Sequence, residues 1–132
     1  MTTTLQARNL SIALTANDLE RSVRFYTDGL GFTIDQREEA DGKLQGVMLK
    51  AGDAWLGLSQ DDFAKGRNRV KGVGMSLYFE TEQDIHMLAG RAKNAGIALD
   101  REAGPLPWGP VGFSATDPDG FKITVTNPGP SA

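Results

Sequence analysis

The sequence predicts an α+β domain built from two tandem β-α-β-β-β modules. Three observations lead to this prediction: strand-like and helix-like patterns follow one another in a fixed order, that order occurs twice, and the two copies keep register at a spacing of 65 residues. Polar turns separate the strand-like runs, as they do in hairpins. We expect a single domain over residues 1–132, with module one at about 8–59, a linker at 60–72 and module two at about 73–127.

The first module opens with a strand that leads into a helix. Apolar and small polar residues alternate in the period-two pattern of a half-buried strand, with the apolar side formed by Leu10, Ile12 and Leu14. Asn17 and Glu20 have the spacing of a capping box, so we expect Asn17 to cap the helix. The helix then presents an apolar stripe formed by Leu19, Val23 and Tyr26.

The second module repeats this opening 65 residues later. The three apolar strand residues become Met75, Leu77 and Phe79, and Thr81 and Asp84 again have capping spacing. We expect a helix over residues 81–95 that Gly96 ends, with a stripe formed by Ile85, Leu88, Ala89 and Ala92. Because strand, cap, stripe and glycine all keep register, we interpret the halves as an internal repeat.

Three strand-like runs follow each helix. They cover about 32–39, 44–50 and 54–59 in the first half, and about 97–102, 111–116 and 121–126 in the second. Asp41 and Gly42 predict a two-residue hairpin turn. The Asp-Pro-Asp-Gly sequence at 117–120 predicts a type I turn between the last two strands.

The composition excludes several classes of function. The 132 residues contain no cysteine, which rules out disulfides, thiolate nucleophiles and Cys-ligated zinc. A net charge of −3 argues against nucleic acid as the main partner. No apolar run has the length of a membrane span, and the first ten residues lack the apolar core of a signal peptide. We therefore expect a cytoplasmic protein with no nucleic-acid or membrane partner.

Several motifs, taken in order, resemble the vicinal-oxygen-chelate superfamily, which includes glyoxalases, bleomycin-resistance proteins and extradiol dioxygenases. They form the first helix and its exit, the opening of module two and the closing hairpin, at 18–22, 25–26, 30–32, 77–80, 95–96, 108–109, 113 and 117–120. The resemblance implies curved mixed sheets that pair around a cleft. It also implies that enzymes of this kind hold a divalent metal there through four side chains on the first and last strands of each module.

The resemblance places those four ligand positions at Ser11, Gly57, Ser76 and Thr124. Strand parity independently puts the two serines and the threonine on the side facing away from the helices. A divalent metal needs imidazole, carboxylate or thiolate donors, and neither a hydroxyl nor glycine replaces them. We therefore expect no metal and no other cofactor, and we interpret the chain as a metal-less member similar to bleomycin-resistance proteins.

No other catalytic constellation replaces the metal. The single histidine, His86, falls off the apolar stripe of its helix, so we interpret it as a surface residue. Glu80 is the best candidate for a metal-free acid–base role because it shares strand parity with Tyr78. We prefer to interpret Glu80 as a solvated carboxylate at the rim of the cleft, and we expect no catalytic residue.

The expected cleft offers aromatic surface instead. Tyr78 follows Ser76 on the cleft side, Trp55 and Met48 lie on strands of module one, and Trp108 and Phe113 lie near the last hairpin. Core or dimer packing would use the same rings, and for the tryptophans this alternative stays open. The predicted ligand-binding residues are Trp55, Tyr78, Trp108, Phe113, Met48, Ser11, Ser76 and Thr124.

Four cations, Lys65, Arg67, Arg69 and Lys71, gather in the linker. We interpret them as a solvated linker; a cationic rim that attracts an anionic ligand is the alternative.

These observations predict a metal-independent binding protein that sequesters a small planar or aromatic drug or metabolite and acts as a homodimer. The first alternative is a glyoxalase- or dioxygenase-like enzyme, a lyase or an oxygenase, with an atypical or displaced metal site. The second alternative is an interaction module with no small ligand.

Overall fold

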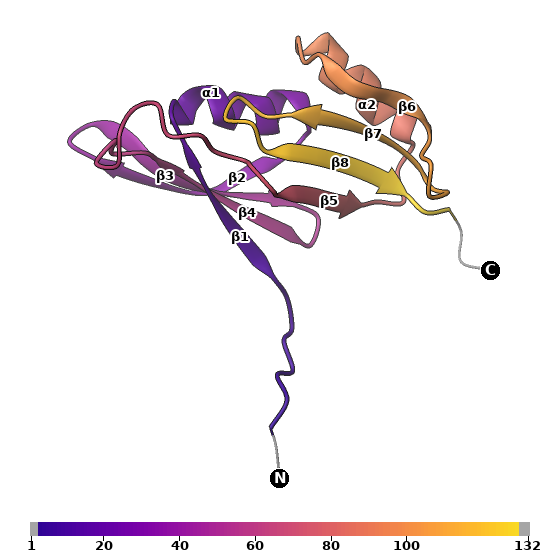
Figure 1. Ribbon diagram of the computed structural model, residues 1–132, viewed down its shortest axis with the longest axis horizontal. Coiled ribbons are helices and arrows are strands. Elements are labelled where there is room, and N and C mark those ends of the chain that lie inside the picture. The colour runs from indigo at the N-terminus through magenta and orange to yellow at the C-terminus, as the bar shows by residue number, and fades with distance from the viewer. Residues whose placement is uncertain (1–2, 130–132) are drawn as a thin grey trace.

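The computed structural model describes residues 3–129 and contains two four-stranded mixed sheets (Figure 1). The first, in the order β1-β4-β3-β2, is formed by β1 (Ser11–Ala16), β2 (Thr33–Ala40), β3 (Lys43–Ala51) and β4 (Ala54–Gln60). The second, in the order β5-β8-β7-β6, is formed by β5 (Ser76–Glu80), β6 (Leu99–Pro105), β7 (Val111–Thr116) and β8 (Lys122–Asn127). In each sheet the first strand of the module is an edge strand parallel to its neighbour, and the other pairs are antiparallel. The predicted α+β fold of two repeated modules is confirmed.

The helices lie on the same side of the two sheets in Figure 1. Helix α1 (Leu19–Arg24) continues into a single π-helical turn, η1 (Phe25–Gly29), and α2 (Ile85–Asn94) is the helix of module two. The predicted stripes are confirmed, because Leu19, Val23 and Tyr26 are buried on the inner side of α1 and η1. On α2, Ile85, Ala89 and Ala92 are buried and Leu88 is partly buried. None of the helices between residues 3 and 129 is long and apolar enough to cross a membrane.

Both helices begin one or more residues later than predicted, because an aspartate caps each of them. The side chain of Asp18 accepts a hydrogen bond from the backbone N–H of Arg21 at 3.2 Å, and that of Asp84 accepts one from His86 at 2.9 Å. The prediction that Asn17 caps α1 is wrong, because its side chain accepts a bond from Lys71 in the linker. The second helix does not begin at residue 81.

The strand faces follow the predicted alternation only inside the strands. Leu14 and Leu77 are each 3% exposed and face the helices. Leu10 is 79% exposed and Met75 39% exposed, because both residues precede the strands to which the alternating pattern assigned them. Segment 3–10 runs away from the body of the molecule at the indigo end of the ribbon in Figure 1.

The two modules share one hydrophobic core. Leu77 and Ile123 of the second sheet belong to the same cluster of buried side chains as Leu19 and Tyr26 of the first module. The rings of Phe32 and Phe79 meet edge to face across the junction, with 5.4 Å between their centroids. A smaller cluster fills the space under α2 and is formed by Ile85, Ala89, Ala92 and Phe113.

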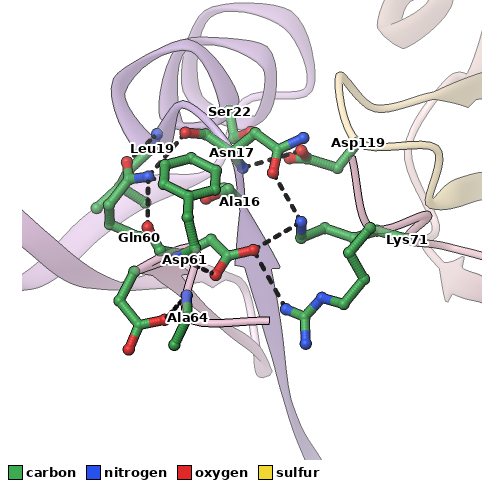
Figure 2. Close-up of polar contacts among 12 residues, drawn as sticks. Ala16, Asn17, Leu19, Ser22, Gln60, Asp61, Ala64, Lys71 and Asp119 are labelled. Carbon is green, nitrogen blue, oxygen red and sulfur yellow. Dashed lines mark hydrogen bonds and ion pairs between the residues drawn. The ribbon is translucent and has the colours of Figure 1, made fainter. Parts of the chain in front are cut away.

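Polar contacts tie the linker and the second module to the end of β1 (Figure 2). The buried carboxylate of Asp61 lies 2.8 Å from Nζ of Lys71 and 3.2 Å from the guanidinium of Arg69. Lys71 also donates to the side chain of Asn17 at 2.7 Å, and the backbone N–H of Asn17 donates to Asp119 at 2.9 Å. The interpretation of a solvated linker is therefore wrong for Lys71, whose side chain is 5% exposed. This part of the linker belongs to the fold because a buried carboxylate needs cationic partners.

Candidate functional site

Two exposed rings lie together beside the second sheet. The side chains of Tyr78 on β5 and Trp108 meet edge to face, with 6.2 Å between ring centroids, although they are 59% and 58% exposed. Trp108 is held by a turn in which the N–H of Gly109 donates to the carbonyl of Leu106 at 2.9 Å. Because Leu106 is buried, the base of the turn is anchored while the indole faces solvent.

The strand register brings three of the predicted ligand-binding residues to one face. Tyr78 lies directly opposite Thr124, and Ser76 lies two residues before Tyr78 on the same side of β5. Thr124 is 8% exposed, so most of this residue is covered by its neighbours on the sheet. This face therefore combines two hydroxyl side chains with two rings.

The equivalent face of the first sheet carries Ser11, Met48 and Trp55. Ser11 lies opposite Trp55, and both Met48 and Ala13 lie opposite Gly57. A shallow depression of about 250 Å³ lies over this sheet and is lined by Ala13, Gln36, Arg37, Glu38, Gly46, Val47, Met48, Gly57, Leu58 and Ser59. Nζ of Lys50 lies 4.9 Å from the centroid of the Trp55 indole, so the ring is partly covered by a cation.

Comparison with known proteins places the fold in a family. Residues 9–125 match the model of the Glyoxalase/Bleomycin resistance protein/Dioxygenase superfamily. The chain belongs to this superfamily. It is 29% identical over 123 residues to Glutathione transferase FosA of Serratia marcescens, a match that covers 92% of this chain and 80% of that protein. It is 27% identical over 128 residues to a probable lactoylglutathione lyase of Vibrio cholerae, covering 89% and 88%.

Solved structures agree on the fold of this superfamily member. The structure of TioX from Micromonospora sp. ML1 superimposes with a TM-score of 0.73 at 18% sequence identity, covering 92% of this chain and 98% of that one.

At the positions that the sequence resemblance assigns to metal ligands, the donor atoms do not fit a divalent metal. The equivalence of these positions in the two modules is supported by register, since Gly57 pairs with Ala13 as Thr124 pairs with Tyr78. Ser11, Gly57, Ser76 and Thr124 offer at most neutral hydroxyl groups, which bind divalent metals weakly. Among residues 3–129, no three His, Cys, Asp or Glu side chains gather in a way that would hold a metal ion.

The structure corrects the expectation for Phe113. Its side chain is 2% exposed and belongs to the core under α2. Phe113 pairs with Val125, whereas its neighbour Ser114 pairs with Thr124, so the phenylalanine points to the helix side of the sheet. The ring of Phe113 therefore does not share the face that carries Tyr78 and Thr124.

Glu80 and His86 are both exposed. Glu80 ends β5 and lines a cavity at the junction of the modules, to which neither Ser76 nor Thr124 contributes. His86 lies in the first turn of α2 and contributes only its backbone N–H to the Asp84 cap.

Two side-chain contacts were not predicted from the sequence. The hydroxyl of Tyr26 donates to the buried carboxylate of Asp117 at 2.8 Å, and burial raises the pKa of Asp117 although three hydrogen bonds oppose the rise. No local pattern indicates this pair, because its members are 91 positions apart. The contact of Lys50 with Trp55 was predictable, because strand alternation puts Lys50 on the same face as Met48.

Proposed function

We propose that this superfamily member is a metal-independent binding protein that sequesters a small planar drug or metabolite. The observation that carries the proposal is the exposed pair of Tyr78 and Trp108 beside Ser76 and Thr124, which the resemblance assigns to metal-ligand positions. A planar molecule stacked on these rings would bury apolar area worth about 25 cal/mol per Å². The two hydroxyl groups would supply the few polar contacts that fix its orientation.

The first sheet supplies a second aromatic face with Trp55, Met48 and Ser11, beside the cation of Lys50. We propose that a homodimer brings a face of this kind against the Tyr78 face of the partner and so encloses the ligand. Enclosure matters because small-molecule sites bury most of the surface of their ligand.

The experiment is a screen of planar compounds by intrinsic fluorescence, since Trp55 and Trp108 are the only tryptophans. For a compound that quenches it, Trp108→Ala should weaken binding several-fold, in line with about 0.5–1.5 kcal/mol for an aromatic pair. The fold should persist, because more than half of the ring is already in solvent. A Trp108→Ala variant that unfolds, together with the absence of any quenching compound, would show that Trp108 is a packing residue.

The second candidate function is catalysis, and it is favoured by the names of the relatives, a glutathione transferase and lactoylglutathione lyases. Such an enzyme would need a metal bound at an atypical or displaced site. Elemental analysis of protein purified without chelator distinguishes the two candidates. About one Zn²⁺, Ni²⁺, Fe²⁺ or Mn²⁺ per subunit, as in mononuclear metal sites, would exclude the metal-independent function.

A further inference from the structure

The internal repeat creates two equivalent junctions between the modules, and the chain fills them differently. At one junction the five residues between β7 and β8 reach the first helix, where Asp117 accepts from Tyr26 at 2.8 Å and Asp119 accepts from Ser22 at 3.1 Å. At the other junction only two residues, 52 and 53, connect β3 to β4. Because this turn is shorter, it does not reproduce the contact with the helix of the opposite module.

The structural equivalence of the modules shows what is absent at the second junction. The capping aspartates Asp18 and Asp84 align the two helices, so the buried Ala92 stands where Tyr26 stands in the first module. By strand register Lys50 corresponds to Thr116, so Ala51 stands where Asp117 stands in the second module. An alanine side chain forms no hydrogen bond, and the guanidinium of the neighbouring Arg91 donates to the carbonyls of Thr27 and Asp28, at 3.1 and 3.2 Å. The Tyr–Asp contact of one junction therefore has no counterpart at the other.

A cavity of about 620 Å³ occupies this second junction. Its volume is within the range of roughly 300–1,000 Å³ found for small-molecule sites. The apolar part of its lining comes from both modules and consists of Leu30, Phe32, Ala51, Ala54, Phe79, Leu88 and Val125. Because the rings of Phe32 and Phe79 pack edge to face, the wall that they form is held by the shared core.

The charged groups of the cavity give it a negative bias. Asp53 and Glu80 line it from opposite modules, and neither carboxylate makes an ion pair within residues 3–129. Arg91 is the cation among the lining residues, and two of its donors are already bonded to backbone carbonyls. An ammonium group would have two free carboxylates to contact, and its hydrocarbon part would cover the apolar wall.

We propose that this junction cavity binds a small organic cation with an apolar body, of the arylalkylamine class. The site is separate from the sheet face that carries Tyr78 and Trp108, and the two proposals stand independently. Asp53 and Glu80 contact the ammonium, and Phe32, Phe79 and Leu88 contact the apolar body.

The probe is 2-phenylethylamine, titrated into the uniformly ¹⁵N-labelled full chain and followed by amide chemical shifts. The neutral 2-phenylethanol and the anionic 3-phenylpropionate are the matched compounds. The expected result is a set of shifts confined to the amides of Gly52, Asp53, Glu80 and Leu88, with tighter binding of the amine than of either matched compound. Equal binding of amine and alcohol, or shifts centred on Tyr78 and Trp108, would overturn the proposal.

Two variants test the charge and the space separately. Glu80→Gln should weaken amine binding roughly two- to five-fold, the range for a solvent-accessible ion pair, and should leave the alcohol unchanged. Ala54→Leu should block both compounds, because residue 54 lines the cavity beside an exposed turn. Glu39→Gln, on the exposed part of β2, is the control and should have no effect. Amine binding unchanged in Glu80→Gln contradicts the proposal even if Ala54→Leu fails to fold.

Discussion

Tyr26 links the two modules through a hydrogen bond, and ionisation of its hydroxyl would destabilise the folded state. Its side chain is fully buried, and its hydroxyl donates to Asp117. Burial, with the negative charge of Asp117 close by, raises the pKa of Tyr26 far above its ordinary value of 10.0. Since the unfolded chain ionises near pH 10, the folded state keeps its stability below that pH and loses it as the pH rises further.

We therefore predict that the melting temperature of the wild type falls more steeply above about pH 10 than that of Tyr26→Phe. At neutral pH the same variant should lose about 1–3 kcal/mol, because a buried carboxylate loses a donor. In a Tyr78→Phe variant Tyr26 is the single tyrosine left, so tyrosinate absorbance should rise only as circular dichroism reports unfolding. Ionisation of Tyr26 in a chain that is still folded would contradict this prediction.

Asp61 makes the stability of the folded state depend on pH in the acid range, where stability is lost as the pH falls. Its hydrogen bonds with Lys71 and with the N–H of Phe63, and the charge of Arg69, lower the pKa of its carboxyl to about 2. The stabilisation is present above the unfolded value of about 3.9 and is lost as the pH falls toward 2. Asp61→Asn should lower the melting temperature at neutral pH and flatten its decline in acid.

Asp62→Asn is the matched control for this prediction, because the Asp62 carboxylate accepts only the N–H of Ala64 in the described chain. Thermal melts of both variants between neutral pH and the acid limit would decide the matter. If Asp61→Asn kept the acid profile of the wild type, the ion pair with Lys71 would not contribute to stability.

At the scale of elements, the linker and the last hairpin turn fit together closely. Gly72 has φ +76°, and a Cβ there would collide with the carbonyl of Gly120. Gly74 has nearly the same φ of +72°, yet nothing lies within 4 Å of a Cβ built on it. We predict that Gly74→Ala costs about 1–2 kcal/mol, the price of a left-handed residue, and that Gly72→Ala costs clearly more. Urea unfolding measures both, and equal losses would mean that the linker does not press on the turn.

Elements that obey a local period were predictable, and contacts between distant elements were not. The alternation inside the strands, the helix stripes and the Asp41–Gly42 turn, with φ of 53° and 74°, appear as predicted. The helix starts were misplaced because Asn17, the expected cap, is held by Lys71 from 54 positions away. Phe113 was misplaced because its orientation depends on its register with Val125, which the surrounding glycines and prolines obscure.

The same distinction applies to the ligand face. The alternation of side chains along β5 was sufficient to place Ser76 and Tyr78 on one face. The pairing of Tyr78 with Thr124 on β8 then adds the threonine to this face. The approach of Trp108 to Tyr78 is a contact between a loop and a strand 30 positions apart in the chain, and no periodic pattern reports it.

For the molecule as a whole, we predict a homodimer. Within the described residues β1 and β5 both lie at the edge of a sheet, and edges of that kind are usually covered. Large apolar side chains are exposed as well, among them Leu5, Leu10, Tyr78 and Trp108. Sedimentation equilibrium at micromolar concentration should give twice the chain mass of 14.2 kDa. A mass of one chain would count against a ligand site shared between subunits.

The shared core also determines when the protein is able to fold. Tyr26 and Phe32 belong to the first module, but they share one buried cluster with Phe121 and Ile123, which leave the ribosome roughly ninety residues later. The backbone N–H of Asn17 likewise lacks its acceptor until Asp119, 102 positions further on, has been synthesised. During synthesis the first module must therefore keep an aromatic surface open to solvent until nearly the whole chain has emerged. Association of two nascent chains through that surface is the hazard such a topology carries, and folding as one late cooperative event is its consequence.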